Sequence, residues 1–482
     1  MRFLRLNCAQ MSVRPFLLAS IILVSLAAVP AVNGQMLEPL PLWNYRSGSY
    51  HDLVVMSSNA EYVVAGAYKD GLYLFSRESG TPLWHHKIGE AEDSLSPVVS
   101  TIAVSDDGRY VAAGVSETER WRVMLFSREA DAPLQTYKLD NTPFSVALSS
   151  DGRYMAVGYG YGTVRLFSRD SQKSLWSYEA GKPVMSVAIS SDGQYVVAAS
   201  NDHGVYMFGR ESGTPRWSYK AGGPIRAVAI SSNPKYAVAG SADDSVYLLN
   251  VNTGIPLWSY RTEGVVETVA ISADGNYVVA GSDDRSVYLF GHEGDSPLWS
   301  YVTGDRVNWV SISSDGMYIV TGSDRAYMFS RNSGIPLWIY SIPGEEGERG
   351  NEFLSVAVSS DGKYIAGAAM YAGVYLFDRD ATRTVTATTQ TTTSHSEKAI
   401  TSSPVFSVST SSPVVQETTA MAWFSALVVV AVCGVSIYYL FRKRRESVSR
   451  ISEHLRYCIN CRCKLPANAV FCDKCGTRQA EE

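Results

Sequence analysis

Apolar and polar residues alternate in short runs between residues 41 and 379, and these runs recur in a fixed order. One unit reads "VETVAISADGNYVVAGSDDRSVYLFGHEGDSPLWSY" (266–301), in which turns rich in Asp and Gly separate four strand-like runs. The tyrosines of an "SxDGxY" element mark the repeat, and in its central part they lie 41 residues apart. Four short strands in each unit of about 40 residues, repeated in tandem, predict the blades of a β-propeller.

The two ends of the repeat indicate how many blades form. The "PLWSY"-type run occurs eight times, and its first copy, at 41–45, precedes any complete unit. The last unit ends at 374–377 without its fourth run. A closed ring resolves both facts if residues 41–45 supply the fourth strand of the last blade. We therefore predict an all-β fold over residues 35–380: an eight-bladed propeller with four-stranded blades and strand-exchange closure.

The repeat resembles two known families. "SSDGxYVVAGS…VYLF" is similar to WD40-type repeats, and "NTGIPLWSYRTEG" (252–264) resembles the tryptophan-docking motif of quinoprotein (PQQ)-like propellers. In that family the motif's tryptophan packs between neighbouring blades, and the resemblance implies this role for Trp43, Trp84, Trp176, Trp217, Trp258, Trp299 and Trp338. Gln135 stands where the second blade should have tryptophan, so a weaker joint is expected there.

Both ends of the chain carry apolar segments. Residues 1–34 combine early arginines, an apolar run and small residues, which is the form of a secretory signal, with an uncleaved N-terminal anchor as the alternative. Residues 421–441 have the length of a single transmembrane helix, and the basic juxtamembrane segment 442–456 opens with "RKRR". Clustered Lys and Arg stay on the cytoplasmic side. We therefore expect a single-pass type I protein of the cell membrane, with the propeller outside.

Between propeller and membrane span lie residues 381–420, which are rich in Ser and Thr. That composition cannot form a packed core. It resembles an O-glycosylated stalk, and an unmodified disordered linker is the alternative.

The last segment, 457–482, is expected to bind zinc in the cytoplasm. Its spacing is C-x2-C-x10-C-x2-C, formed by Cys458, Cys461, Cys472 and Cys475. Four thiolates can surround a structural zinc ion tetrahedrally. The segment resembles a small zinc-ribbon, although Arg462 replaces a usual glycine and Cys463 is an extra thiol. A zinc-ribbon of this kind implies a cytoplasmic protein partner.

The propeller offers little that points to catalysis. The innermost runs, such as "SVAIS" and "TVAIS", contain no acid, base or histidine apart from Asp52, and general acid–base chemistry needs such groups. No cysteine lies between residues 35 and 420, so the adjacent-cysteine disulfide of quinoprotein dehydrogenases cannot form, and no PQQ is expected. The Asp-rich turns are interpreted as hairpin closures, with calcium ligands as the alternative. A net charge of −5 does not suggest a nucleic-acid partner.

Three longer insertions are the best pointers to a binding surface, because loops carry function on rigid scaffolds. They occupy residues 89–99 and 116–122, which belong to blade 2, and residues 342–353, which enter blade 8. Ring closure would make blades 8, 1 and 2 neighbours and so bring the insertions into one sector. The candidate ligand-binding residues are Glu90, Glu92, Asp93, Arg120, Trp121, Glu345, Glu346 and Glu348. Surface insertions that are merely tolerated are the alternative.

The sequence thus favours a non-enzymatic propeller that binds a protein, peptide or saccharide outside the cell. The alternative is a quinoprotein-like surface enzyme or an envelope-assembly scaffold.

Overall fold

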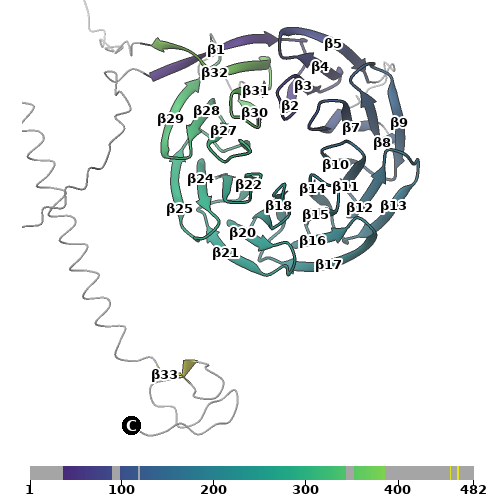
Figure 1. Cartoon of the computed structure of the whole chain (residues 1–482), viewed down its shortest axis with the longest axis vertical. Helices are drawn as coiled ribbons and strands as arrows, with labels where there is room; N and C mark the ends of the chain where they lie inside the picture. Colours follow the sequence, from purple (N-terminus) through teal and green to yellow (C-terminus); the bar gives the residue numbers. More distant parts are fainter. Residues whose placement is uncertain are drawn as a thin grey trace, which may run out of the picture. The chain divides into compact units, whose positions relative to one another are not determined.

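The computed structural model describes residues 36–88, 98–117, 120–343 and 352–385, together with the residue pairs 456–457 and 464–465. The chain divides into two compact units, Met1–Gln390 and Thr391–Glu482. In the described part of the first unit every regular element is a β-strand, and these strands form a ring of blades (Figure 1). No helix in the described residues is long and apolar enough to span a membrane, and the span predicted at 421–441 lies outside them.

The ring has eight antiparallel sheets of four strands each, so the predicted blade number and strand number are confirmed. We number the blades 1 to 8 in the order of their innermost strands. The innermost strands are β2 (His51–Met56), β6 (Val98–Val104), β10 (Pro143–Leu148), β14 (Val184–Ile189), β18 (Ile225–Ile230), β22 (Val266–Ile271), β26 (Trp309–Ile312) and β30 (Phe353–Val358). The second strands are β3 (Tyr62–Ala67), β7 (Tyr110–Glu117), β11 (Tyr154–Tyr159), β15 (Tyr195–Ser200), β19 (Tyr236–Ser241), β23 (Tyr277–Ser282), β27 (Tyr318–Gly322) and β31 (Tyr364–Ala369).

The outer half of each blade follows the same order. The third strands are β4 (Gly71–Ser76), β8 (Arg120–Ser127), β12 (Thr163–Ser168), β16 (Gly204–Gly209), β20 (Ser245–Asn250), β24 (Ser286–Gly291), β28 (Ala326–Ser330) and β32 (Gly373–Val385). The outermost strands are β5 (Ser79–Lys87), β9 (Pro133–Leu139), β13 (Ser174–Glu179), β17 (Ser212–Lys220), β21 (Pro256–Arg261), β25 (Pro297–Val302), β29 (Ser333–Tyr340) and, for blade 8, β1 (Met36–Tyr45).

Strand exchange closes the ring as predicted. β1 pairs antiparallel with β32, with Tyr45 opposite Val374 and Met36 opposite Val385. The exchanged strand is longer than the 41–45 run because the pairing continues past the blade, where Glu38 forms an ion pair with Arg383 at 2.8 Å. Closure removes the free edge that blade 8 would otherwise present.

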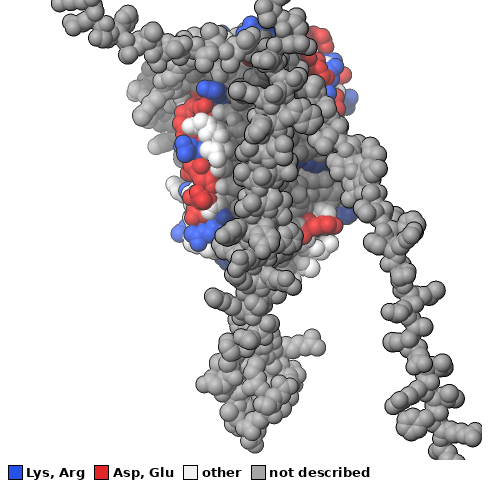
Figure 2. Space-filling view, turned by 90° about the vertical axis from the view of Figure 1, so that its left-hand side faces the viewer, with Lys and Arg blue, Asp and Glu red and all other residues white. Residues whose placement is uncertain are grey.

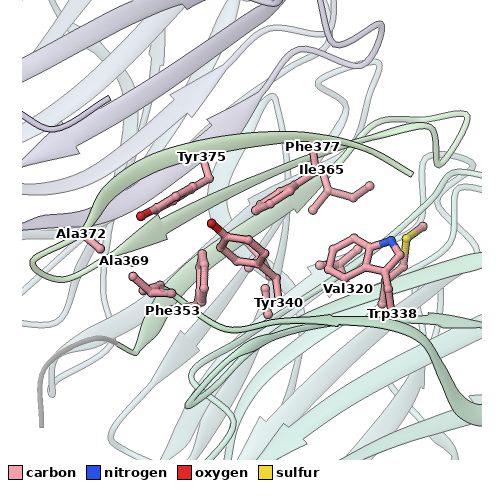
Figure 3. Close-up of a cluster of buried hydrophobic side chains, with 13 residues drawn as sticks. Val320, Trp338, Tyr340, Phe353, Ile365, Ala369, Ala372, Tyr375 and Phe377 are labelled. Carbon is pink, nitrogen blue, oxygen red and sulfur yellow. The ribbon is translucent and has the colours of Figure 1, made fainter. Parts of the chain in front are cut away.

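The core is distributed over the joints between blades. Eight clusters of buried apolar side chains each join two neighbouring blades. Figure 3 shows the cluster between blades 7 and 8, in which Trp338 and Tyr340 of β29 face Phe353, Tyr375 and Phe377 of blade 8. The second strands are almost wholly buried on both sides, which explains their continuous "YVVAG" runs.

In the second unit the described residues form one short pairing, between β33 (Arg456–Tyr457) and β34 (Lys464–Leu465). The four cysteines predicted to bind zinc lie outside the described residues.

Candidate functional site

The tryptophans of the outermost strands lie at the blade joints. In six blades the indole N–H donates to a backbone carbonyl that follows the third strand of the next blade. These bonds join Trp43 to Arg77 (2.8 Å), Trp84 to Arg128 (3.0 Å), Trp176 to Arg210 (2.8 Å), Trp217 to Val251 (2.6 Å), Trp258 to His292 (3.1 Å) and Trp299 to Arg331 (2.9 Å). These side chains hold the ring together.

Arginines at the same backbone positions make a second contact across the joint. The guanidinium of Arg169 lies 4.2 Å from the ring centroid of Tyr110, which belongs to the preceding blade. Equivalent pairs are Arg77 with Tyr364, Arg128 with Tyr62, Arg210 with Tyr154, Arg331 with Tyr277 and Arg379 with Tyr318. The conspicuous Arg and Tyr residues of the repeat are therefore engaged in cation–π contacts that stabilise the ring.

The last tryptophan departs from this pattern. Trp338 is buried, but its Nε1 has no hydrogen-bond partner among the described residues. In the other blades the chain turns after the third strand, whereas β32 continues to Val385 to pair with β1. The missing hydrogen bond thus accompanies strand-exchange closure.

The Asp-rich turns close hairpins between second and third strands. Asp243 accepts a hydrogen bond from the hydroxyl of Tyr247 at 2.8 Å, and Asp284 accepts one from Tyr288 at the same distance. His203, Asp244 and Arg285 have positive φ angles at these turns, as hairpin geometry requires. In the part of the chain that the structure describes, no three His, Cys, Asp or Glu residues group as metal ligands. The contacts of these aspartates agree with the hairpin interpretation.

The described strand ends that flank the predicted ligand-binding loops belong to one face of the ring. We call it the top face, defined as the face at which the innermost strands begin and the second strands end. Six of the eight predicted residues, Glu90, Glu92, Asp93, Glu345, Glu346 and Glu348, lie outside the described residues. Arg120 is exposed at the start of β8. Trp121 is half-buried against the cluster between blades 2 and 3, so it is less exposed than the sequence suggested.

The top face also carries charged residues that the sequence analysis missed. Most of the innermost strands begin one or two residues earlier than the "SVAIS"-type runs. As a result β2 includes His51, β18 includes Arg226 and β22 includes Glu267. The expectation of an innermost wall without bases or further acids is therefore wrong. Aligning the eight innermost strands from one residue further back would have revealed these side chains.

His51 and Asp52 form one part of this charged set. The His51 imidazole is fully buried, with Nε2 at 2.9 Å from the hydroxyl of Ser47, and burial lowers its pKa to about 4. Burial raises the pKa of the Asp52 carboxyl to about 6, and its Oδ1 has no partner among the described residues. The two neighbours are therefore both held towards their neutral forms.

A second set lies on blades 5 to 7. Arg226 Nε lies 3.7 Å from Glu267 Oε1, and both side chains are about one third exposed. Burial raises the pKa of Glu267, Asp283 raises it further, and Arg226 and Arg306 act in the opposite direction. This set therefore contains both acidic and basic side chains. On the side of the ring that Figure 2 shows, acidic and basic side chains also lie close together.

Asn308 and Trp309 continue this set into blade 7. The amide Nδ2 of Asn308 donates to the carbonyl oxygen of Phe353 at 3.2 Å, which ties blade 7 to blade 8. Trp309 opens the innermost strand β26 and is 42% exposed. An amide, an indole and balanced charges therefore lie on neighbouring blades of the top face.

The chain matches the sequence model of one protein family. The sequence model of the family described as outer membrane protein assembly factor BamB matches residues 115–260 and 242–425, which is more than half of the chain. Among curated proteins, no sequence matches this chain.

Proposed function

Because the chain belongs to the PQQ-like propeller family described as outer membrane protein assembly factor BamB, we propose that it is a non-enzymatic binding or scaffold module. The observation that carries this proposal is the gathering of irregular features on one face. The repeat is regular at most joints and turns, whereas Asp52, Arg226, Glu267 and Trp309 break it at the top face. A rigid scaffold with variation concentrated on one face is typical of a binding protein.

The proposed partner is a protein, peptide or saccharide outside the membrane. The acidic insertions at 89–99 and 342–353 would surround the top face and select partners by charge. The family description favours one form of this function, a scaffold for assembly in the cell envelope. A quinoprotein-like surface enzyme is the alternative, and incubation of the protein with quinone, calcium and alcohols would detect its activity.

Site-specific photocrosslinking in cells tests the proposed face. A photoreactive amino acid at Tyr161 would report on the top face, since this residue lies between β11 and β12 and is 71% exposed. The matched position on the opposite face is Asn276, which is partly exposed in the turn between β22 and β23. We expect partner crosslinks from Tyr161 and none from Asn276. Crosslinks from Asn276 alone would place the binding surface on the other side.

We further propose that residues 421–441 span the cell membrane once and that the zinc-ribbon 457–482 binds a protein partner in the cytoplasm. The basic segment after the span supports this orientation. In intact cells, a membrane-impermeant maleimide should leave Cys463, the thiol outside the proposed zinc ligand set, unlabelled until the membrane is permeabilised. Labelling before permeabilisation would mean that the tail lies outside the cell and that the proposed orientation is wrong.

Zinc binding by the tail is tested by metal analysis of the full-length protein. We expect one zinc per chain, lost in Cys458→Ser and Cys472→Ser because each removes one of four thiolate ligands. Cys463→Ser is the matched control and should keep its zinc. Loss of zinc in the control would mean that the ligand set is wrong.

A further inference from the structure

One position of the innermost strands is occupied by small residues in most blades. Where this residue is Ser or Thr, its hydroxyl oxygen accepts a hydrogen bond from a backbone N–H of the next blade. Thr101 accepts from Val146 (3.0 Å), and Ser145 accepts from Val187 (3.0 Å). Ser186, Thr268 and Ser355 do the same. These hydrogen bonds join the innermost strands of neighbouring blades, and we call this row of contacts the inner seam of the ring.

Blade 7 has Trp309 at this position. The seam to blade 8 is instead made two residues later, where Ser311 Oγ accepts from the N–H of Val358 at 3.2 Å. Trp309 is 42% exposed, so its indole surface is not used in a joint as that of Trp299 or Trp338 is. A large aromatic residue that replaces a seam hydroxyl and stays exposed is a local departure that packing does not explain.

Polar side chains with hydrogen-bonding capacity lie on the same sector. Arg226 Nε has no hydrogen-bond partner among the described residues, although Glu267 Oε1 lies 3.7 Å away. That ion pair restrains both side chains before any ligand arrives, which lowers the entropy lost on binding. Asn308 is fixed by its bond to the carbonyl of Phe353. The sector therefore combines a free aromatic surface with restrained donors and acceptors.

We propose that Arg226, Glu267, Asn308 and Trp309 form a binding site for a neutral saccharide, with the Trp309 indole against the face of one sugar ring. This proposal rests on the proposed function as a binding module and names the ligand class for the top face.

The chemistry of a sugar fits this set of groups. A pyranose has an apolar C–H face, which can cover an indole, and hydroxyls that both donate and accept hydrogen bonds. Glu267 can accept from hydroxyls, and Arg226 can donate to them. The Nδ2 of Asn308 already donates to the Phe353 carbonyl and to Glu352, so Asn308 would contribute its Oδ1 as an acceptor. The two arginines near Glu267, Arg226 and Arg306, are balanced by Glu267 and Asp283, which favours a neutral ligand over a polyanion.

The test applies the full-length protein to an array of neutral oligosaccharides built of glucose, galactose, mannose or N-acetylglucosamine, with uronic-acid oligomers alongside. Affinity for the best neutral oligosaccharide is then measured by calorimetry. We expect Trp309→Ala to weaken binding roughly tenfold or more and Trp309→Phe to weaken it less, because the phenyl ring keeps part of the stacking surface. Arg226→Gln should weaken binding without lowering Tm.

The matched control is Tyr371→Ala, which removes another exposed aromatic residue from the top face, between β31 and β32 of blade 8. Its affinity should equal that of the unaltered protein. The proposal of a neutral saccharide would be overturned if the protein bound no neutral oligosaccharide, or if it bound only uronic-acid oligomers. Equal affinity of Trp309→Ala and the unaltered protein would overturn the site. In either case crosslinks from Tyr161 would still support the broader binding function.

Discussion

The side-chain amide of Gln135 donates a hydrogen bond to the carbonyl oxygen of Arg169. This carbonyl occupies the same place in blade 3 as those that accept from tryptophan in other blades, for example Arg210 from Trp176. Gln135 therefore keeps the hydrogen bond of the joint and lacks only the indole surface. Tyr137, two residues on, packs against Phe167 with 4.7 Å between ring centroids.

Substitution at Gln135 should separate these two contributions. Gln135→Ala leaves the Arg169 carbonyl without its partner and should lower the free energy of unfolding by about 1–2 kcal/mol. Gln135→Trp should raise it by about 1 kcal/mol, because the indole keeps the hydrogen bond and adds contact with the next blade. Urea unfolding of the three proteins measures both changes. A less stable Gln135→Trp protein would mean that the joint cannot accommodate the larger ring.

The unpartnered indole of Trp338 gives a prediction about the closing joint. Benzothienylalanine, a tryptophan analogue of nearly the same shape without the N–H, should destabilise the protein by about 1 kcal/mol at position 299. The reason is that Trp299 donates to Arg331 at 2.9 Å. At position 338 the analogue should have no cost, since Nε1 has no partner among the described residues. Equal losses of Tm at both positions would contradict this difference.

The "SxDGxY" turns predict a third effect. Gly193 has a φ of +66°, and a Cβ there would lie 2.6 Å from Cδ2 of Tyr154 in the preceding blade. Gly193→Ala should therefore lower the free energy of unfolding by at least about 1–2 kcal/mol through backbone strain, with the clash in addition. Gly294→Ala is the control, because nothing lies within 4 Å of its Cβ position. Thermal unfolding of both variants would contradict the prediction if their Tm values were equal.

The sequence predicted the ring well because its physical causes are local and repeated. Every blade has its own turn and strand signals, and the unmatched run at Pro41–Tyr45 required an exchanged strand. The same regularity hid the top face. The repeated "SVAIS"-type run does not include Arg226 or Glu267, because each lies one residue before the run in its strand. Which of the side chains that break the repeat lie close together depends on how neighbouring blades are placed around the ring. Arg226 and Glu267, which are 41 residues apart, are an example.

The neighbours His51 and Asp52 should give opposite pH dependences. The pKa of His51 is lowered to about 4, so its contribution to stability is full above pH 6.5 and is lost as the pH falls towards 4. The pKa of Asp52 is raised to about 6, so its contribution is full below pH 3.8 and is lost as the pH rises towards 6. Between pH 4 and 6 the two effects partly cancel.

Removing one of them should expose the other. Asp52→Asn should lose up to about 3 kcal/mol more than the unaltered protein between pH 6.5 and 4, because only the His51 effect remains. His51→Gln should show the reverse slope relative to the unaltered protein. Urea midpoints measured across this range test both, and parallel profiles for all three proteins would mean that neither group is linked to folding.

Ring closure gives the last prediction. β1 supplies the outer strand of blade 8, and Trp43 also donates to Arg77 of blade 1 at 2.8 Å, so this one segment fastens two blades. Deleting residues 36–46 should leave an unpaired edge on β32, lower Tm by roughly 10 °C or more and promote oligomers. A synthetic peptide of residues 36–46 added in trans should restore the monomer, whereas the same peptide with Trp43→Ala and Tyr45→Ala should not. Leu42→Ser is the control within the intact chain, because Leu42 is exposed and should leave Tm unchanged. A deletion protein that melts like the intact chain and stays monomeric would show that blade 8 does not depend on β1.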